Sequence, residues 1–295
     1  MNDFTEEKQS HECPKTAGEC ICWAAELLAK SAVENARADA EWLLSHALNC
    51  KRMDLYIRLN YLPNEEQREQ FINFLHRRCR REPLQYILGT APFCGFDLVV
   101  DRRVLIPRPE TEELIAAIRS HCEEERSTVE SILDLGTGSG AIIIALGKLF
   151  PHAALSAGDI DGDALRVAAA NAECHSMKSR ITFLQSNWFS NVNGLWSLIV
   201  SNPPYLSHGE VEQAECEVKD HEPRWALCSA GDGSVDIEII MDQARKFLHP
   251  NGILALEMGS GHREKLNDLA KRLGYSRWKS FTDQWKKPRF FILTR

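Results

Sequence analysis

The feature that most restricts the fold of this chain is a glycine-rich turn at residues 134–140, with the sequence Asp-Leu-Gly-Thr-Gly-Ser-Gly. The turn follows the apolar segment 131–135, which is typical of a buried strand, and precedes a helical stretch that continues to Phe150. Glycines between a strand and a helix allow a tight turn and let a ligand approach the backbone closely. Such turns also occur for structural reasons alone, so this one indicates a strand–helix unit and a candidate ligand site.

The spacing of the glycines bears on the kind of ligand. The pattern is G-x-G-x-G, whereas the motif that binds a pyrophosphate is G-x-G-x-x-G. A ligand without phosphates, such as S-adenosylmethionine, suits this spacing better. The predicted cofactor-binding residues of the turn are Gly136, Thr137, Gly138, Ser139 and Gly140.

A carboxylate follows the second apolar segment of this region. Asp159 comes nineteen residues after Gly140, at the expected end of a strand. A carboxylate in that place can accept hydrogen bonds from both hydroxyls of a ribose, and we expect it at an exposed strand end. The alternative role is that of a helix N-cap, which Asp161 or Asp163 can fill equally well.

After Pro109 the sequence alternates apolar segments with helical stretches. Alternation of this kind predicts a mostly parallel sheet covered by helices on both faces. The expected fold class is therefore α/β, with a seven-stranded Rossmann-like sheet. The strands are expected at 131–135, 154–157, 181–184, 195–200 and 252–257, with two more near Tyr275 and Phe290.

The sequence before this region has a different pattern. Apolar residues recur at the spacing of one helical face at Ala40, Leu43, Leu44, Ala47 and Leu48, which predicts a small helical bundle. Aromatic and β-branched residues between glycine turns then indicate a β-hairpin. The expected organisation is a flexible arm at 1–17, a helical domain at 18–88, a β-hairpin linker at 89–106 and a catalytic domain at 107–295.

Charge and missing patterns exclude several classes of protein. A formal net charge of −7 argues against a protein that grips phosphate backbones, so no stable nucleic-acid partner is expected. We find no apolar run of about eighteen residues and no secretory signal, so we expect a cytoplasmic protein without membrane association. The ten cysteines are irregularly spaced and form no C-x-x-C pair, so no metal site is expected.

The most informative motif for chemistry is Asn202-Pro203-Pro204-Tyr205, directly after the apolar segment 198–200. Two consecutive prolines stiffen the backbone and remove two N–H donors, which leaves carbonyl groups free to accept hydrogen bonds. The Asn202 side-chain oxygen and the Pro203 carbonyl together offer two acceptors to one NH₂ group. Holding both N–H groups lets the nitrogen pyramidalise towards a sulfonium methyl without a general base. Tyr205 can then cover the flat face of the substrate group.

This motif alone leaves two substrate classes open. A side-chain amide and the exocyclic amine of adenine fit the same pair of acceptors, so an adenine-specific nucleic-acid methyltransferase is the alternative function. That alternative requires a basic surface, which the net charge of −7 does not favour. A simple turn is the structural alternative, but the motif is expected at the carboxyl end of a strand, where ligands bind in such sheets.

Several segments resemble the PrmC/HemK family of protein-glutamine methyltransferases, which modify peptide-chain release factors. Residues 37–44 and 82–89 of the helical region are similar to that family. The segment Leu-Ile-Pro-Arg-Pro-Glu-Thr-Glu at 105–112 looks like the family signature, and residues 222–227 and 231–233 resemble its late loop. The N-P-P-Y motif is shared with amine methyltransferases generally, whereas I-P-R-P-E-T-E is much more specific.

The resemblance implies a class I methyltransferase. Because every cofactor motif lies after Gly89, we expect the helical domain to recognise the protein substrate. It implies transfer of a methyl group to the side-chain amide nitrogen of the glutamine in the Gly-Gly-Gln motif of class 1 peptide chain release factors. The donor is S-adenosyl-L-methionine, which leaves as S-adenosyl-L-homocysteine. Carried over to this chain, Gly136 to Gly140 and Asp159 hold the methionine and ribose parts of the cofactor.

The resemblance also assigns the remaining contacts. Trp188 packs on adenine, and Asn202 to Tyr205 hold the substrate glutamine, with Asn202 also beside the cofactor. One position departs from the family, which often has Asp before the Trp-Phe pair, where this chain has Asn187. An amide oxygen can still accept a hydrogen bond from the adenine amine, so Asn187 is kept as a cofactor-binding residue. We expect a monomer whose protein partner is the release factor.

Overall fold

A computed structural model describes residues 14–295, and in it the chain divides into two compact units. The first unit ends at Leu88, and the second runs from Gly89 to Arg295. Each unit has hydrophobic core clusters of its own. Of the arm expected at 1–17, residues 1–13 lie outside the described residues.

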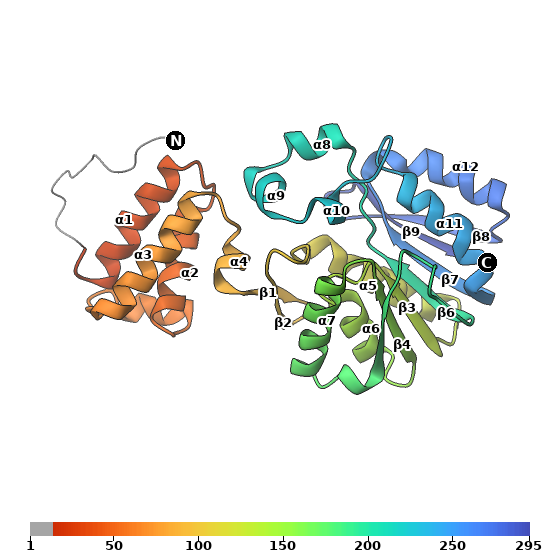
Figure 1. Cartoon of the computed structure of the whole chain (residues 1–295), viewed down its shortest axis with the longest axis horizontal. Coiled ribbons are helices and arrows are strands. Elements are labelled where there is room, and N and C mark those ends of the chain that lie inside the picture. Colours follow the sequence, from red (N-terminus) through yellow and green to blue (C-terminus); the bar gives the residue numbers. More distant parts are fainter. Residues whose placement is uncertain (1–13) are drawn as a thin grey trace. The chain divides into compact units, whose positions relative to one another are not determined.

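The first unit is a bundle of helices with a single core, which confirms the predicted helical region. Helix α1 begins directly after Thr16, which caps its N-terminus. The Thr16 side chain accepts a hydrogen bond from the Glu19 N–H, and the Glu19 carboxylate accepts one from the Thr16 N–H. Farther along, Arg78 donates to the buried Asp39 carboxylate over 2.7 Å and links the third helix to the second. The helices are α1 (Ala17–Lys30), α2 (Ala36–Ala47), η1 (Arg52–Ile57), α3 (Glu65–Cys79) and α4 (Leu84–Leu88) (Figure 1).

The second unit begins with an antiparallel hairpin of β1 (Thr90–Phe93) and β2 (Phe96–Val99). Asn171 fastens this hairpin to a helix of the same unit: its side-chain oxygen accepts from the Val99 N–H over 2.7 Å, and its NH₂ group donates to the Val99 carbonyl over 2.9 Å. The same NH₂ group donates to the Ser139 carbonyl in the glycine turn. The hairpin expected from the sequence is therefore present and is built into the second unit.

The central element of the second unit is a seven-stranded sheet in the order β5-β4-β3-β6-β7-β9-β8. The first five strands of this order are parallel, and β9 is antiparallel to both of its neighbours. The predicted seven-stranded, mostly parallel sheet is thereby confirmed. The strands are β3 (Ser131–Leu135), β4 (Ala154–Asp159), β5 (Ile181–Gln185), β6 (Trp196–Ser201), β7 (Leu248–Glu257), β8 (Arg277–Thr282) and β9 (Pro288–Thr294).

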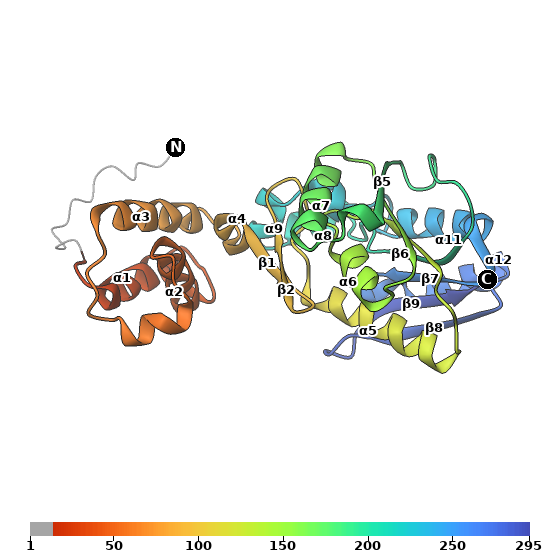
Figure 2. The same ribbon diagram turned by 90° about the horizontal axis from the view of Figure 1, so that it is seen from below.

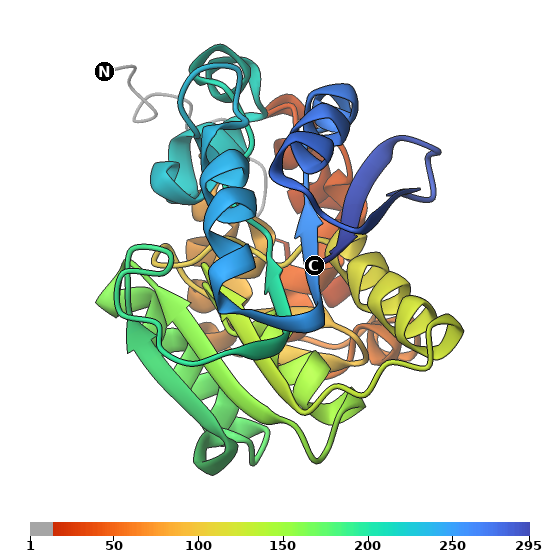
Figure 3. The ribbon, with the colours of Figure 1, turned by 90° about the vertical axis from the view of Figure 1, so that its right-hand side faces the viewer.

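Helices cover both faces of the sheet, as can be followed in Figures 2 and 3. Side chains alternate along each strand, so Ile132 and Leu198 pack in one core with α5 (Pro109–Glu124), α6 (Ala141–Leu149) and α7 (Gly162–Cys174). Leu133 and Ile199 pack in the other core with α11 (Val235–Phe247) and α12 (Arg263–Leu273). The remaining short helices are η2 (Lys178–Arg180), α8 (His208–Gln213), α9 (Cys216–His221), α10 (Arg224–Leu227) and η3 (Ser260–His262). Within residues 14–295, no helix is both long and apolar enough to span a membrane.

The strand order reverses beside β3. From β3 the chain moves outward to β4 and β5, and it then returns to β6 on the other side of β3. In parallel sheets, ligands bind in the crevice outside the carboxyl ends of the strands at such a reversal. The glycine turn and the N-P-P-Y motif follow strands that end at this edge, and Asp159 is the last residue of β4, which ends there too.

Candidate active site

The glycine turn after β3 takes a shape that L-residues rarely adopt. Gly136, Gly138 and Gly140 have φ angles of +70°, +52° and +81°. A Cβ on Gly140 would lie 3.3 Å from the Cα of Ala168, so this glycine allows α7 to pack closely. No atom lies within 4 Å of the place where a Cβ on Gly138 would stand. Gly138 therefore faces open space that a ligand can enter.

Asp159, the last residue of β4, holds this turn. Its Oδ2 accepts from the Gly138 N–H over 2.9 Å, and its Oδ1 accepts from the Asp161 N–H over 3.0 Å. The expectation of an exposed carboxylate is wrong, because the glycine turn folds over the end of β4 and leaves Asp159 only 8% exposed. Burial raises the pKa of Asp159, and the two backbone N–H groups oppose that rise.

Helix α7 does not use Asp159 as its cap. The N-cap is Asp161, whose side chain accepts from the Asp163 N–H over 2.9 Å. Each carboxylate oxygen can accept two hydrogen bonds, so both Asp159 oxygens still have a lone pair for a ribose hydroxyl. The geometry thus favours the ligand-binding interpretation of Asp159 over the capping one.

A second carboxylate supports the turn from the protein interior. Asp134 is fully buried and accepts a hydrogen bond of 2.7 Å from the Thr137 hydroxyl. Burial raises the pKa of Asp134 to about 7, and the Thr137 hydrogen bond opposes the rise. Thr137 and Ser139 are both buried. Of the predicted turn residues, they and Gly140 shape the turn, whereas Gly136 and Gly138 face the cavity next to it.

That cavity has a volume of about 360 Å³, within the range of small-ligand sites. It lies at the carboxyl edge of the parallel strands and brings together residues from four separate strand ends. Seven of the predicted site residues line it: Gly136, Gly138, Asp159, Asn187, Trp188, Asn202 and Pro204.

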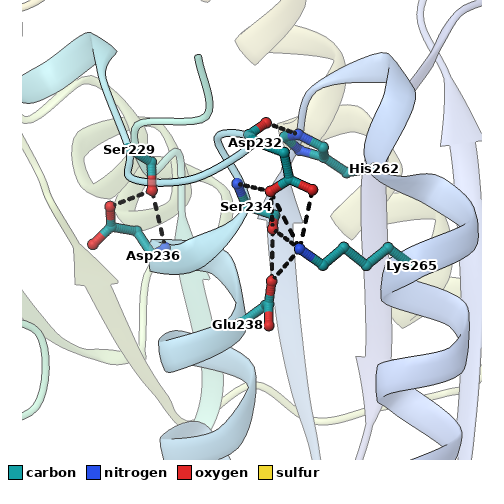
Figure 4. Close-up of polar contacts among 7 residues, drawn as sticks. All are labelled: Ser229, Asp232, Ser234, Asp236, Glu238, His262 and Lys265. Carbon is teal, nitrogen blue, oxygen red and sulfur yellow. Dashed lines mark hydrogen bonds and ion pairs between the residues drawn. The ribbon is translucent and has the colours of Figure 1, made fainter. Parts of the chain in front are cut away.

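The Trp188 ring is held beside the glycine turn. A Cβ on Gly136 would lie 3.5 Å from the Trp188 ring, and the indole N–H donates to Oδ1 of Asp236 over 3.1 Å. Asp236 is itself fixed, because its Oδ2 accepts from the Ser229 hydroxyl over 2.6 Å (Figure 4). Asn187 is exposed at the edge of the cavity. Asp236 also lines the cavity and was not predicted, since nothing in the sequence links it to a tryptophan 48 residues away.

The loop that carries Ser229 is itself cross-linked to two helices. Lys265 of α12 lies 3.0 Å from the Asp232 carboxylate and 2.7 Å from Glu238 of α11 (Figure 4). The hydroxyl of Ser234 and the Lys265 ammonium hold the pKa of Asp232 well below its usual value.

The same loop approaches the backbone of the N-P-P-Y motif closely. A Cβ on Gly233 would collide with the carbonyl oxygen of Tyr205. This loop therefore packs directly against the backbone of the N-P-P-Y motif.

The N-P-P-Y side chains are tied to a buried glutamate. Asn202 donates from Nδ2 to the Thr111 hydroxyl over 3.2 Å, and that hydroxyl donates to Oε2 of Glu257 over 2.7 Å. The Tyr205 hydroxyl donates to Oε1 of the same carboxylate over 3.0 Å. Burial raises the pKa of Glu257, and the hydrogen bonds from Thr111 and Tyr205 oppose it. Burial and the Glu257 charge raise the pKa of Tyr205, so its hydroxyl remains a donor.

Comparison with known proteins identifies the family. Residues 19–89 match the model of the PrmC N-terminal domain, and residues 114–231 match that of the methyltransferase small domain. The release factor glutamine methyltransferase of Geobacter sulfurreducens is 38% identical over 88% of this chain and 90% of its own length. That of Buchnera aphidicola is 38% identical over 85% and 89%. The chain belongs to the release factor glutamine methyltransferase family.

Solved structures agree on the fold of this family member. A methyltransferase from Pyrococcus furiosus has a TM-score of 0.51 at 18% identity, covering 74% of this chain and 98% of its own. The hMettl16 catalytic domain, in complex with the MAT2A 3'UTR hairpin 1, has a TM-score of 0.55 at 14% identity, covering 75% and 80%. At identities this low, the structural similarity bears on the fold alone. It confirms the class I methyltransferase fold.

Two segments that resemble the release factor glutamine methyltransferases meet in the structure. Arg108, from the I-P-R-P-E-T-E segment, donates to the buried Glu222 carboxylate of the late loop over 2.6 Å. Burial raises the pKa of Glu222 to about 7, and Arg108 opposes this rise. The pair joins residues 114 positions apart, so the signature segment anchors the late loop.

We predict that Asp159→Asn weakens the binding of S-adenosylmethionine about 10²-fold. The substitution keeps the size of the side chain but replaces one acceptor oxygen by a donor, and a hydrogen bond to a charged group contributes about 1.5–3 kcal/mol. Alanine is less suitable, because it would also leave the Gly138 N–H without its acceptor. Calorimetry of folded protein measures the affinity, with Asp163→Asn, in the first turn of α7, as the control. An unchanged affinity in folded Asp159→Asn would show that Asp159 does not bind the ribose.

Proposed function

We propose that this chain transfers a methyl group to the side-chain amide nitrogen of the glutamine in the Gly-Gly-Gln motif of class 1 peptide chain release factors. The observation that carries the proposal is the common cavity of Asn202, Gly138 and Asp159, in a chain whose relatives are release factor glutamine methyltransferases. Asn202, which we propose to hold the substrate amide, thus borders the same cavity as Gly138 and Asp159, which we propose to hold the cofactor. A release factor as protein partner implies action in the cytoplasm, where translation ends.

The residues around the cavity fit S-adenosylmethionine. The open space beside Gly138 leaves room for the methionine part, since a Cβ there would meet no atom within 4 Å. Asp159 retains acceptors for both ribose hydroxyls, and the Trp188 ring offers a flat surface for adenine. When bound, S-adenosylmethionine supplies a methyl group on a positively charged sulfur and leaves as S-adenosylhomocysteine.

The side chains of the motif position and activate the substrate nitrogen. The Asn202 Nδ2 group donates a hydrogen bond to the Thr111 hydroxyl oxygen. The Asn202 Oδ1 is therefore available to accept a hydrogen bond from one N–H of the substrate amide. The Pro203 carbonyl accepts the other N–H, because the following residue is also proline and the backbone is rigid. Two fixed acceptors favour the pyramidal nitrogen of the transition state over the planar amide. The bond from the sulfur to the methyl group breaks as the bond to the nitrogen forms, and the nitrogen then releases one of its two protons to water.

The alternative substrate, an adenine of a nucleic acid, is not favoured. The fold that this chain shares with an RNA-bound catalytic domain does not bear on substrate, because the identity is 14%. The relatives at 38% identity carry the name of an enzyme that acts on a release factor. The net charge of −7 also does not suit a nucleic-acid substrate.

A labelling experiment tests the substrate. The full chain is incubated with methyl-labelled S-adenosylmethionine and, separately, with a class 1 release factor, the same factor with Gln replaced by Glu in Gly-Gly-Gln, and duplex DNA. We expect label only in the unaltered release factor, because a carboxylate offers no N–H for Asn202 and Pro203 to hold. Label in DNA, or in the Glu-substituted factor at the same level, would overturn the proposed function.

The trapping mechanism predicts that Asn202→Ala slows methyl transfer about 10²–10³-fold, the usual effect of removing one preorganised polar group at a reacting centre. Affinity for S-adenosylmethionine should change far less, since its principal contacts are at the glycine turn and Asp159. Single-turnover methylation measures the rate, with binding measured in parallel and exposed Asn193→Ala as the control. A near-normal rate in Asn202→Ala would refute the trap.

We also propose that the helical domain, residues 18–88, recognises the release factor. Every predicted cofactor residue lies after Gly89, in a unit with its own core. A chain that starts at Gly89 should therefore bind S-adenosylmethionine like the full chain and methylate the release factor at least about tenfold more slowly, a loss of roughly 1.4 kcal/mol. Full activity of the shortened, folded chain would contradict this role.

A further inference from the structure

We propose that Glu257, acting through Thr111, determines which end of the Asn202 side-chain amide faces the substrate, and so makes the site select an NH₂ group over a carboxylate. Neither residue was a candidate on sequence grounds. The inference deepens the proposed function and rests on it for the identity of the substrate. It gives Thr111 and Glu257 the role of positioning residues.

The argument starts from the single proton of the Thr111 hydroxyl. Thr111 Oγ1 lies 2.7 Å from Oε2 of Glu257 and 3.2 Å from Nδ2 of Asn202. An ionised carboxylate only accepts hydrogen bonds, so the Thr111 hydroxyl donates its one hydrogen bond to Glu257. The Thr111 oxygen then has only lone pairs to offer, and Asn202 must turn its NH₂ group towards it.

This orientation has a direct consequence for the cavity. With Nδ2 directed to Thr111, the carbonyl Oδ1 of Asn202 is the end of the amide that remains to accept a hydrogen bond. In the opposite orientation the Asn202 NH₂ group would be presented, and that donor would suit a carboxylate oxygen. The two ends of an amide have nearly the same size, so the hydrogen-bond partners, and not the shape of the pocket, decide between them.

The carboxylate itself is held in place from two sides. Tyr205 donates to Oε1 of Glu257 over 3.0 Å while Thr111 donates to Oε2, so both oxygens are engaged by donors. Glu257 is 1% exposed, which excludes solvent as a competing partner. The Arg289 guanidinium, 5.8 Å from the centre of the Tyr205 ring, is a positive charge close to this group. Burial raises the pKa of Glu257, and the hydrogen bonds from Thr111 and Tyr205 and the Arg289 charge oppose that rise. These three groups stabilise the carboxylate form on which the direction of the relay depends.

The experiment uses three variants of the full chain and a matched control. Thr111→Ser keeps the hydroxyl, Thr111→Val replaces it with a methyl group, and Glu257→Gln replaces one acceptor oxygen by a donor. The control is Glu264→Gln, at an exposed position of α12. The measurements are kcat and KM for the release factor, affinity for S-adenosylmethionine, and inhibition by the release factor with Glu in place of the target Gln.

We expect Thr111→Ser and Glu264→Gln to stay within about threefold of the unaltered chain in every measurement. For Thr111→Val and Glu257→Gln, kcat should fall about tenfold or more, the effect of one lost hydrogen bond at about 1.4 kcal/mol, with cofactor affinity unchanged. Both variants should also bind the Glu-substituted factor about tenfold more tightly relative to the Gln form. Unchanged kcat and unchanged Gln-over-Glu preference in Glu257→Gln would overturn the proposal, as would equal losses in Thr111→Ser and Thr111→Val.

A spectroscopic measurement tests the relay without any substrate. With asparagine labelled by ¹⁵N, the side-chain NH₂ signals of Asn202 should be protected from exchange in the unaltered chain and in Thr111→Ser. Protection should be lost in Thr111→Val and in Glu257→Gln. Protection that persists in Thr111→Val would overturn the relay even if the release factor is methylated. Conversely, absence of methylation with this pattern intact would overturn the proposed function and leave the relay supported.

Discussion

The candidate site depends on the parallel pairing around β3. In the observed register, Leu135 lies opposite Gly158 of β4 on one side and opposite Ser201 of β6 on the other. The next residue on each strand is therefore Gly136, Asp159 or Asn202, so the three residues lie at the same height. Gly136 and Asn202 come just after the ends of β3 and β6, whereas Asp159 is still paired with Gln185 of β5. A parallel sheet has all its carboxyl ends at one edge, and the reversal of strand order beside β3 opens the crevice there. The glycine turn and the N-P-P-Y motif are neighbours because of this register.

Three buried carboxylates, Asp134, Asp159 and Glu257, each organise a part of the site at this edge. A buried charge is costly unless it accepts hydrogen bonds, so Asp134, Asp159 and Glu257 each take donors from other segments. The first two fix the glycine turn, and the third joins α5 to the N-P-P-Y motif. The same contacts that stabilise these charges thus set the positions of the groups that would touch cofactor and substrate.

The sequence predicted most of this architecture from local patterns. Alternating apolar segments indicated the seven strands, and the glycine spacing indicated a turn open to a ligand. Asp159 was located at a strand end, but its burial was not foreseen, because the turn that covers it comes from another strand. Asp236 and Glu257 could not be found from spacing, since their partners Trp188 and Thr111 lie 48 and 146 residues away.

By itself, the sequence determined the elements and the residue types at their ends, because strand periodicity, glycine turns and proline pairs act on neighbouring residues. It supplied the glycines, the carboxylate and the Asn-Pro-Pro segment of the candidate site. Only the tertiary structure decided how these groups are oriented and charged. Burial sets the pKa of Asp134, Asp159 and Glu257, and hydrogen bonds between distant segments fix the Trp188 ring and the Asn202 amide. These are properties of three-dimensional contact, which forms only when the sheet brings the strand ends together.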